Sequence, residues 1–350
     1  FNRFNSKILN YTFKVKITLK NIADDVGVSM ATVSRVLASK GPFNPETERR
    51  IIDSAYRLGY PGVKFLRHKV KHSLDIAVIT PMWLGEFDAS LFRGFIEASN
   101  ESKFNIRFVN MDETQKDPVK YLSRTLEDFD GACIFIPYLT SDDYLKLRSV
   151  VNSYPLISLA PITDPILETV TFDSYRGGYL VAKHFHEQGF RKTGIIVGES
   201  IRLESKLRKN GFMNYINETD SMECIWEYQG DFSFDSGVKA YHDINAREIE
   251  NIAIFGSNDA MALGFMREAI RDGKYIPTDY AISGYDDLPF SKLYDPHLTS
   301  VSTDFFKLGK YALKQILKQI EHNDTDEEHV SLVPVSLISR ESTTGEKLTS

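Results

Sequence analysis

The stretch Thr18–Leu37, with the sequence TLKNIADDVGVSMATVSRVL, decides how the first part of this chain folds. Thr18 can cap a first helix, because the apolar residues that follow it recur on one helical face. Gly27 comes directly after that helix, where a left-handed backbone conformation turns the chain. Ser29 can then cap a second helix, whose apolar residues again recur at i, i+3 and i+4. Two short helices joined by a glycine-containing turn predict a helix-turn-helix.

The side of the second helix that faces away from its apolar residues has the chemistry of a DNA-contacting surface. At about 100° per residue, Ala31 and Arg35 lie at the centre of this side, and no acid flanks them. An arginine there can form two hydrogen bonds with guanine, which discriminates against other bases by about 1–3 kcal/mol. Hydroxyl groups and the helix N-terminus would bind phosphates. The expected DNA contacts of the motif are Thr18, Ser29, Met30, Ala31, Thr32, Ser34 and Arg35; the alternative is a solvated helix pair in an ordinary bundle.

The residues after this motif predict a third helix, because Asn44 can cap it and Pro45 suits its first position. The most informative motifs of this region are Ile22-Ala23, Gly27-Val28-Ser29, Thr32-Val33-Ser34-Arg35-Val36-Leu37, Glu46-Thr47 and Leu58-Gly59-Tyr60. With these motifs in this order, residues 17–60 closely resemble the DNA-binding head of the lactose/galactose repressor (LacI/GalR) family. The resemblance implies an all-α helix-turn-helix head that binds double-stranded operator DNA.

Residues 61–73 form a basic hinge segment between this head and the rest of the chain. In the resembled family the hinge folds into a short helix on DNA, and a leucine enters the minor groove. His68 stands where the family leucine belongs, so Leu66 is the nearest candidate here. The expected DNA contacts of the hinge are Lys64, Leu66 and Arg67, with the alternative that a basic linker touches phosphates only.

Composition and charge indicate a globular protein with one nucleic-acid-binding part. Its 350 residues exceed a single typical domain, and 42% hydrophobic and 26% charged residues are ordinary for a globular chain. Residues 1–72 contain 14 Lys and Arg against 5 Asp and Glu, whereas the remainder contains 28 against 43. A basic head on an acidic body is typical of a DNA reader attached to a module that does not bind DNA.

Several classes of protein find no support in the sequence. The sequence contains no run of eighteen apolar residues, so no membrane span is predicted. The two cysteines, Cys133 and Cys224, are too few for a disulfide framework or a zinc site, which favours a cytoplasmic protein. Residues 1–16 have no apolar signal-peptide region; we treat them as an N-terminal extension outside the fold, one explanation being an engineered addition. His184 and His186 point to different helix faces and make no chelating pair. Without a phosphate-binding loop or an HExxH motif, we expect no enzyme, no metal and no cofactor.

From Leu74 onward, short apolar strands alternate with helical segments, which predicts parallel sheets joined by right-handed crossovers. The expected strands are 76–79, 106–109, 131–136 and 156–159 in a first set and 194–197, 252–255 and 280–283 in a second, and helices are expected around 91–96, 177–189 and 260–271. Two such sets predict two doubly wound parallel-sheet subdomains of an α/β body. Their strand ends would face a shared ligand site.

The body also carries recognisable motifs. They are Thr171-Phe172-Asp173, Gly177-Gly178-Tyr179-Leu180, Arg208-Lys209-Asn210-Gly211-Phe212, Gly230-Asp231-Phe232, Ser257–Gly264 and Gly284-Tyr285-Asp286-Asp287. With them, the body resembles the effector domain of the same family, which is like a periplasmic sugar-binding protein. The resemblance implies an effector-binding and dimerisation domain at 74–343, with an N-subdomain at about 74–172 and 302–330, a C-subdomain at about 173–301 and 331–343, and a tail at 344–350. The chain would cross between subdomains near Phe172, Val301 and Pro334.

Matches to family positions that contact the ligand imply an effector site between the subdomains. A sugar presents hydroxyl groups and an apolar C–H face, so arginine, carboxylate and amide groups together with an aromatic ring suit it. The expected effector contacts are Phe172, Asp173, Arg208, Phe232, Asn258 and Asp286. For Arg208 and Asp286 the alternative is a structural salt bridge, and for Phe232 and Trp226 it is a place in the core. The loop 81–90, which includes Trp83, departs from the family pattern.

These features together lead us to expect a cytoplasmic transcriptional repressor that binds a pseudo-palindromic operator as a homodimer. A sugar, with a galactoside as first choice, would be its small-molecule effector. Two alternatives are a carbon-catabolite regulator activated by a phosphorylated carrier protein and a regulator with a purine effector. A transport-type sugar-binding protein would lack the basic head. The last residues, GEKLTS, carry no apolar heptads for a tetramer-forming helix, which favours a dimer.

Overall fold

The computed structural model describes residues 17–38, 42–58, 60, 73–82, 85–101, 104–112, 114–164, 166–322 and 329–344. It contains two compact units, Phe1–Leu74 and Asp75–Ser350, which we call the head and the body. The expectations for residues 1–16, for Lys64, Leu66 and Arg67 of the hinge, and for Trp83 lie outside the described residues.

Three helices form the described part of the head: α1 (Leu19–Val26), α2 (Met30–Leu37) and α3 (Pro45–Arg57). Their ends lie at the local signals that the sequence contains. Thr18 is the N-cap of α1, and Gly27 ends that helix in the left-handed region with a φ of 75°. The Ser29 hydroxyl accepts a hydrogen bond from the Thr32 N–H at 3.1 Å, and the Asn44 side chain caps α3. The predicted helix-turn-helix is therefore present.

One apolar core holds these helices together. Its buried side chains come from all three of them: Ile22, Ala23, Val26, Val33, Val36, Ile51, Ile52 and Ala55. Because Val33 and Val36 of α2 point into this core, the opposite face of α2 is left exposed.

The body contains two six-stranded sheets. The strand order is β11-β5-β4-β3-β1-β2 in the first sheet and β12-β10-β9-β8-β6-β7 in the second. The strands are β1 (Leu74–Thr80), β2 (Phe104–Asn110), β3 (Gly131–Ile134), β4 (Leu156–Ser158), β5 (Thr169–Phe172), β6 (Lys192–Val197), β7 (Glu223–Gln229), β8 (Ile252–Gly256), β9 (Tyr280–Asp286), β10 (Thr299–Ser302), β11 (Val330–Val333) and β12 (Ser336–Ile338). The described pairings are parallel, except that β12 runs antiparallel to β10.

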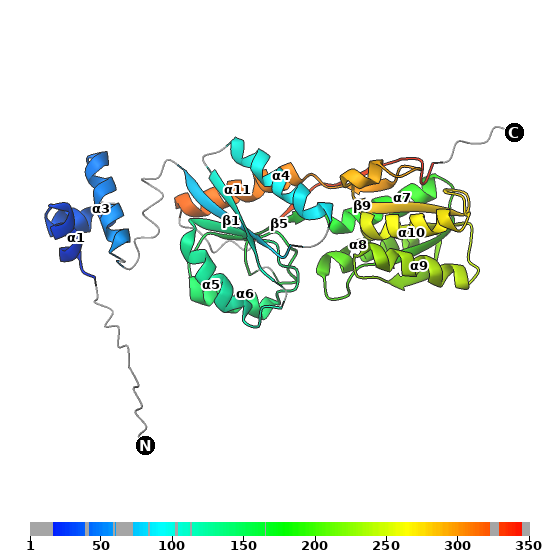
Figure 1. The fold of residues 1–350 in the computed structure, drawn as a ribbon, viewed down its shortest axis with the longest axis horizontal. Coiled ribbons are helices and arrows are strands. Elements are labelled where there is room, and N and C mark those ends of the chain that lie inside the picture. The colour runs from blue at the N-terminus through cyan, green and yellow to red at the C-terminus, as the bar shows by residue number, and fades with distance from the viewer. Residues whose placement is uncertain are drawn as a thin grey trace, which may run out of the picture. The chain divides into compact units, whose positions relative to one another are not determined.

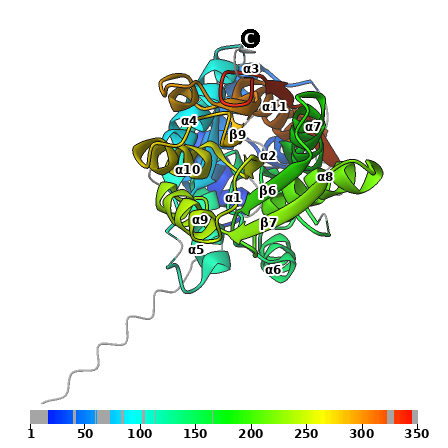
Figure 2. The ribbon, with the colours of Figure 1, turned by 90° about the vertical axis from the view of Figure 1, so that its right-hand side faces the viewer.

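Helices cover both faces of each sheet, which completes the predicted doubly wound α/β subdomains. They are α4 (Glu86–Asn100), α5 (Pro118–Thr125), α6 (Ser141–Val151), α7 (Ser174–Glu187), α8 (Leu203–Glu218), α9 (Phe234–Ala246), α10 (Asp259–Arg271) and α11 (Phe305–His322), with the short 3-10 helices η2 (Leu126–Asp128) and η3 (Pro289–Lys292). Figure 1 shows α4 and α11 on one side of the first sheet and α5 and α6 on the other. Figure 2 shows α7 and α8 on one side of the second sheet and α9 and α10 on the other.

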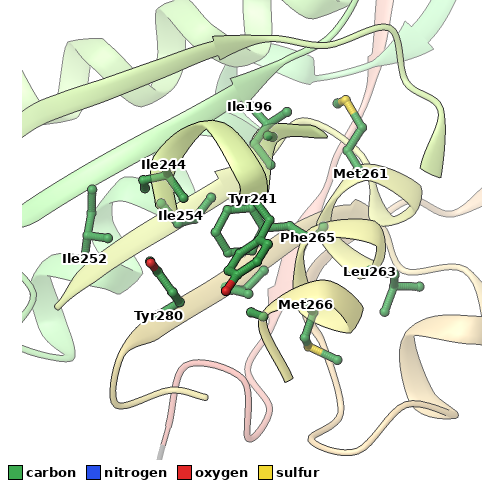
Figure 3. Close-up of a cluster of buried hydrophobic side chains, with 14 of the residues drawn as sticks. Ile196, Tyr241, Ile244, Ile252, Ile254, Met261, Leu263, Phe265, Met266 and Tyr280 are labelled. Carbon is green, nitrogen blue, oxygen red and sulfur yellow. The ribbon is translucent and has the colours of Figure 1, made fainter. Parts of the chain in front are cut away.

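Each subdomain has its own apolar core. In the second, aromatic rings of α9, α10 and β9 pack edge to face, with the Tyr241 and Phe265 centroids 5.5 Å apart and those of Phe265 and Tyr280 5.3 Å apart (Figure 3). Every residue of β8 is buried. A strand buried on both faces is a continuous apolar run, and this is why β8 could be predicted from sequence.

The chain passes between the sheets three times, after Phe172, after Ser302 and after Val333. Two of the expected subdomain boundaries move as a result. Residues 331–333, expected in the C-subdomain, pair with β5 in the first sheet and so belong to the N-subdomain. Ser302, expected in the N-subdomain, pairs with Asp286 in the second sheet and so belongs to the C-subdomain. These strands are three or four residues long, and their pairing partners rather than local patterns assign them to a sheet.

Strand prediction differs further from the structure, because β5, β7, β10, β11 and β12 were not predicted and β3 differs in length. β7 was not predicted, because it is an edge strand in which exposed residues alternate with partly or fully buried ones, and it contains no apolar run. β3 ends at Ile134 rather than at residue 136.

Candidate functional site

The exposed face of α2 presents the residues expected to contact DNA. Thr18, Ser29, Met30, Ala31, Ser34 and Arg35 are exposed, and Thr32 is partly buried. Met30 has 54% of its surface accessible although it is a large apolar residue. Six of the seven expected head residues thus lie on α2 or at its N-cap, with the buried Val33 and Val36 on its other side, whereas Thr18 is the N-cap of α1.

The arginines of α3 are used within the head, which distinguishes them from Arg35. Arg50 donates to the carbonyl of Val26 at the end of α1, at 2.8 Å. Arg57 forms an ion pair with Asp25, whose pKa is lowered first by a hydrogen bond with Ser54 and then by the Arg57 charge. The guanidinium of Arg35, in contrast, lies 5.6 Å from the Phe43 ring. This contact leaves its N–H groups available to an external acceptor such as a base edge.

In the body, Arg208 is the centre of a buried polar cluster. It lies on α8 and is only 7% exposed. Its guanidinium donates to the carbonyl of Ser257 at 2.5 Å and forms an ion pair with Asp286 at 3.5 Å. The same group lies 3.7 Å from the centre of the Tyr285 ring, which is a cation–π contact. Arg208 and Asp286 therefore form the salt bridge that was the alternative to ligand contact, and their contact with an effector stays a prediction.

Asp286 sits at the end of β9 with a φ of 105°, a backbone conformation that residues other than glycine rarely adopt. Burial raises its pKa to about 6; the Arg208 charge opposes this shift and the Glu204 charge adds to it. Strained backbone and a carboxyl group with a raised pKa often occur together at functional sites.

Phe232 and Asn258 lie beside this cluster. Phe232 has a φ of 67°, and its ring centre is 5.9 Å from the guanidinium of Arg208 and 5.3 Å from that of Arg202. Asn258 uses its side-chain oxygen to cap α10 and donates from its side-chain nitrogen to the carbonyl of Phe232 at 2.9 Å. Asn258 consequently holds Phe232 in place, with one amide hydrogen beyond that bond. Trp226 is 3% exposed in the core.

The two expected residues at the first crossover have different surroundings. Asp173 caps α7, and its charge contributes to raising the pKa of Tyr285, which burial raises to about 12. The first turn of α7 also carries Gly177, which packs against the Tyr285 ring, so Asp173 lies near the cluster. Phe172 packs edge-on against Phe305 at 5.3 Å, on the first subdomain. The structure brings Arg208, Phe232, Asn258, Asp286 and, through Tyr285, Asp173 together, and it places Phe172 in an aromatic contact with α11.

Sequence reasoning missed the polar groups that complete this cluster. Glu204 and Ser205 of α8 and Ser257 after β8 are buried, and each has a side-chain oxygen without a hydrogen-bond partner among the described residues. The signal for Glu204 was available, because it precedes Arg208 by four residues and so shares its helix face. Ser257 opens the Ser257–Gly264 motif, whereas nothing local marks Ser205.

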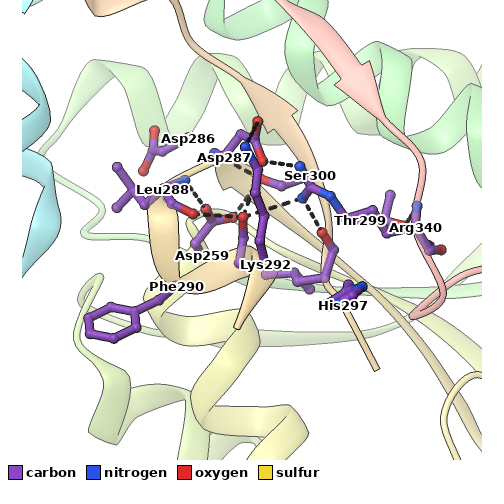
Figure 4. Close-up of polar contacts among 12 residues, drawn as sticks. Asp259, Asp286, Asp287, Leu288, Phe290, Lys292, His297, Thr299, Ser300 and Arg340 are labelled. Atoms are coloured by element: carbon purple, nitrogen blue, oxygen red, sulfur yellow. Dashed lines mark hydrogen bonds and ion pairs between the residues drawn. The ribbon is translucent and has the colours of Figure 1, made fainter. Parts of the chain in front are cut away.

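Asp287, next to Asp286, belongs to a second polar network (Figure 4). Its carboxylate pairs with Arg340 at 2.5 Å, and its N–H donates to Ser300 at 3.1 Å. Ser300 in turn donates to the buried Asp259 at 2.5 Å. The network fixes the segment that continues into η3, where the Phe290 N–H donates to Glu86 of α4 at 2.8 Å. It links the end of β9 to the first subdomain.

A groove of about 800 Å³ lies beside this network. Residues of α4, of the segment 286–293, of the start of α11 and of the crossing 334–336 line it. Its lining includes Asp286 but neither Arg208 nor Phe232, so it adjoins the Arg208 cluster without containing it.

Metal clusters and membrane-spanning helices are absent from the described part of the chain. No group of three or more His, Cys, Asp or Glu side chains there could hold a metal ion. None of the helices described is long and apolar enough to cross a membrane.

Comparison with known proteins gives matches to both parts of the chain. Residues 18–61 match the family described as bacterial regulatory proteins, lacI family, and residues 182–343 match the periplasmic binding protein-like domain. The HTH-type transcriptional repressor PurR of Mannheimia succiniciproducens is 28% identical over 335 residues, covering 92% of this chain and 98% of the relative. Catabolite control protein A of Priestia megaterium is 26% identical over 336 residues, covering 94% and 100%.

The fold has counterparts among solved structures. The Lac repressor dimer bound to operator and the anti-inducer ONPF matches with a TM-score of 0.68 at 24% identity, covering 93% of this chain and 99% of that one. The two family matches follow the order of the head and the body, and the body match covers residues 182–343. The chain therefore combines a lacI-family helix-turn-helix domain with a periplasmic binding protein-like domain.

Proposed function

We propose that this protein is a transcriptional repressor that binds a pseudo-palindromic operator as a homodimer. The observation that carries the proposal is the exposed face of α2, where Arg35 and hydroxyl residues lie opposite the buried Val33 and Val36. One such helix contacts few base pairs, so two heads related by two-fold symmetry would bind two half-sites. The relatives named as repressors support this role.

The proposed effector is a small sugar, with a galactoside as first choice. The support is chemical: Arg208 and Asp286 can form paired hydrogen bonds with vicinal hydroxyls, and Phe232 offers a ring face beside them. We propose that the protein acts in the cytoplasm by binding alone and catalyses no reaction.

Regulation would follow from a change in how the two subdomains pack. Effector binding at Asp286 would act on the adjacent Asp287 and on the contact between Phe290 and Glu86, which joins the second subdomain to the first. A change in the first subdomain would then alter the arrangement of the two heads. A coupling free energy of about 1–3 kcal/mol, or about 5- to 150-fold in affinity, suffices for such a switch.

Two other effectors have specific support. A phosphorylated carrier protein is a candidate because catabolite control protein A is among the relatives. A purine is a candidate because other relatives are repressors named PurR. Titration of operator affinity with a panel of sugars, with purines and with the carrier protein separates the three. If no sugar changes operator affinity, the sugar assignment is wrong.

The DNA-binding role is tested by two substitutions with different expected signatures. Arg35→Ala should reduce discrimination at one operator position per half-site by about 1–3 kcal/mol. Lys64→Ala should weaken binding to operator and random DNA about equally and lower the salt dependence of binding. Binding of each variant to operator, to single-base variants and to random duplex measures both effects. Equal losses on operator and random DNA for Arg35→Ala would remove Arg35 from base recognition.

A further inference from the structure

Glu204 has an unusual position for an acidic residue. It lies on α8 one turn before Arg208 and is 8% exposed. Its Oε2 atom is buried and has no hydrogen-bond partner among the described residues. Burial raises the pKa of Glu204, while its own backbone N–H, Arg208 and Arg202 oppose the shift. A buried carboxylate oxygen without a donor is costly, so the fold retains it for a reason other than stability.

The surroundings of Glu204 place it inside the Arg208 cluster. It precedes Arg208 by one helical turn, and Arg208 pairs with Asp286 at 3.5 Å, so both carboxyl groups belong to the surroundings of this arginine. The charge of Glu204 also contributes to raising the pKa of Tyr144 on α6, after burial.

The charge balance of this cluster is negative. Arg208 pairs with Asp286, and a second acidic residue, Glu204, lies one helical turn before it, so one guanidinium stands beside two acidic residues. The next cation, Arg202, already pairs with Glu199 at 2.7 Å. An anionic ligand would therefore meet repulsion here, whereas a ligand with a positive charge would restore the balance.

The other unpartnered atoms show what kind of ligand is needed. Arg208 Nε and the hydroxyl oxygens of Ser205 and Ser257 are buried without partners among the described residues. Together with Glu204 Oε2 they offer both donors and acceptors within one cluster. A compact polyhydroxylated molecule that carries a donor for Glu204 would satisfy them.

We propose that Glu204 is a specificity-determining residue of the effector site, and that it selects sugars carrying a protonated amine over neutral sugars and sugar phosphates. This inference rests on the proposed sugar effector and names its class. The ammonium group lies between Glu204 and Asp286, and neighbouring hydroxyls bond to Arg208 and the two serines. A charge-assisted hydrogen bond to a carboxylate is stronger than one from a neutral hydroxyl, which gives the preference its physical basis.

The test measures binding of four probes to the full chain by isothermal titration at a pH where the amine is protonated. The probes are D-galactosamine, N-acetyl-D-galactosamine, D-galactose and D-galactose 6-phosphate. We expect D-galactosamine to bind about tenfold more tightly than D-galactose, because one charge-assisted bond replaces a neutral one. N-Acetylation, which removes the charge, should abolish the advantage, and the phosphate should bind most weakly.

Two variants assign the preference to Glu204. Glu204→Gln keeps the side-chain size and should reduce the amine-to-hydroxyl ratio to about one. Glu223→Gln, on the exposed edge strand β7, makes the same charge change and should leave the ratio unaltered. Should Glu204→Gln fail to fold, the unaltered chain still tests the preference itself, because equal binding of D-galactose and D-galactosamine overturns it.

The inference is overturned if D-galactose binds as tightly as D-galactosamine, or if Glu204→Gln keeps the preference. In that event a sugar-dependent change in operator affinity would leave the proposed function standing. If none of the four probes binds while a purine changes operator affinity, the sugar assignment fails and the role of Glu204 fails with it.

Discussion

Replacing Gly211 by alanine tests how closely α7 and α8 must pack for the Arg208 cluster to exist. A Cβ atom on Gly211 would lie 1.8 Å from the carbonyl oxygen of Tyr175 on α7. Real Cβ atoms keep at least about 3.0 Å from such atoms, so the two helices would have to separate by more than 1 Å. A backbone carbonyl inside a helix cannot move aside as a side chain can. We expect a loss of about 3 kcal/mol in the free energy of unfolding, typical of severe overpacking.

The same crossing holds Arg208 in place, so the substitution should also affect function. The Arg208 carbonyl lies against Gly178 of α7, where an added Cβ would approach to 1.9 Å. Separation of the helices would move the guanidinium away from Asp286, with which it pairs at 3.5 Å. Effector response of operator binding should therefore fall even at temperatures where the variant is folded.

Urea unfolding and thermal melting measure the first effect, and a stability loss of this size corresponds to a decrease in Tm of roughly 6–12 °C. Gly273→Ala is the matched control, because Gly273 has a φ of 79° and no atom within 4 Å of an added Cβ. That control should lose only about 1 kcal/mol, from the left-handed backbone. If Gly211→Ala is no less stable than Gly273→Ala, close helix packing is not what the glycine provides.

Two further predictions concern the residues around the end of β9. The pKa of Asp286 is about 6 in the folded protein, above its ordinary value of 3.8. The folded state therefore binds this proton more tightly, and stability falls by up to about 3 kcal/mol as the pH rises from about 4 to 6. Asp286→Asn should remove this component, so a pH-independent difference between the two proteins in urea titrations would contradict the assignment. Arg340→Ala should cost about 3 kcal/mol, since it leaves the partly buried Asp287 with only Lys292 at 3.9 Å and the Ser291 hydroxyl, and removes a donor to the Leu298 carbonyl at 2.6 Å. A Tm unchanged by Arg340→Ala would show that the network in Figure 4 contributes no stability.

The sequence by itself determined the elements whose signals are local. Gly27 ends α1 because only a residue without a Cβ adopts a left-handed conformation at little cost, and Ser29 and Asn44 cap helices through hydrogen bonds to N–H groups two or three residues away. Apolar periodicity assigned the core face of α2 and, by exclusion, its exposed face. The strand β8 could also be predicted, because a strand buried on both faces is a continuous apolar run. Resemblance to family motifs identified Arg208 and Asp286 as candidate effector contacts.

Only the tertiary structure decided which of these residues act together. Arg208 and Asp286 are 78 positions apart, and their pairing depends on the packing of α8 against the second sheet. Burial of Glu204 depends on the same packing, and so sequence could not show that its carboxylate lacks a partner. Asn258 was expected at the ligand, but its oxygen is the cap of α10. Burial and pairing are properties of surfaces that meet from distant parts of the chain, and this is why local patterns do not determine them.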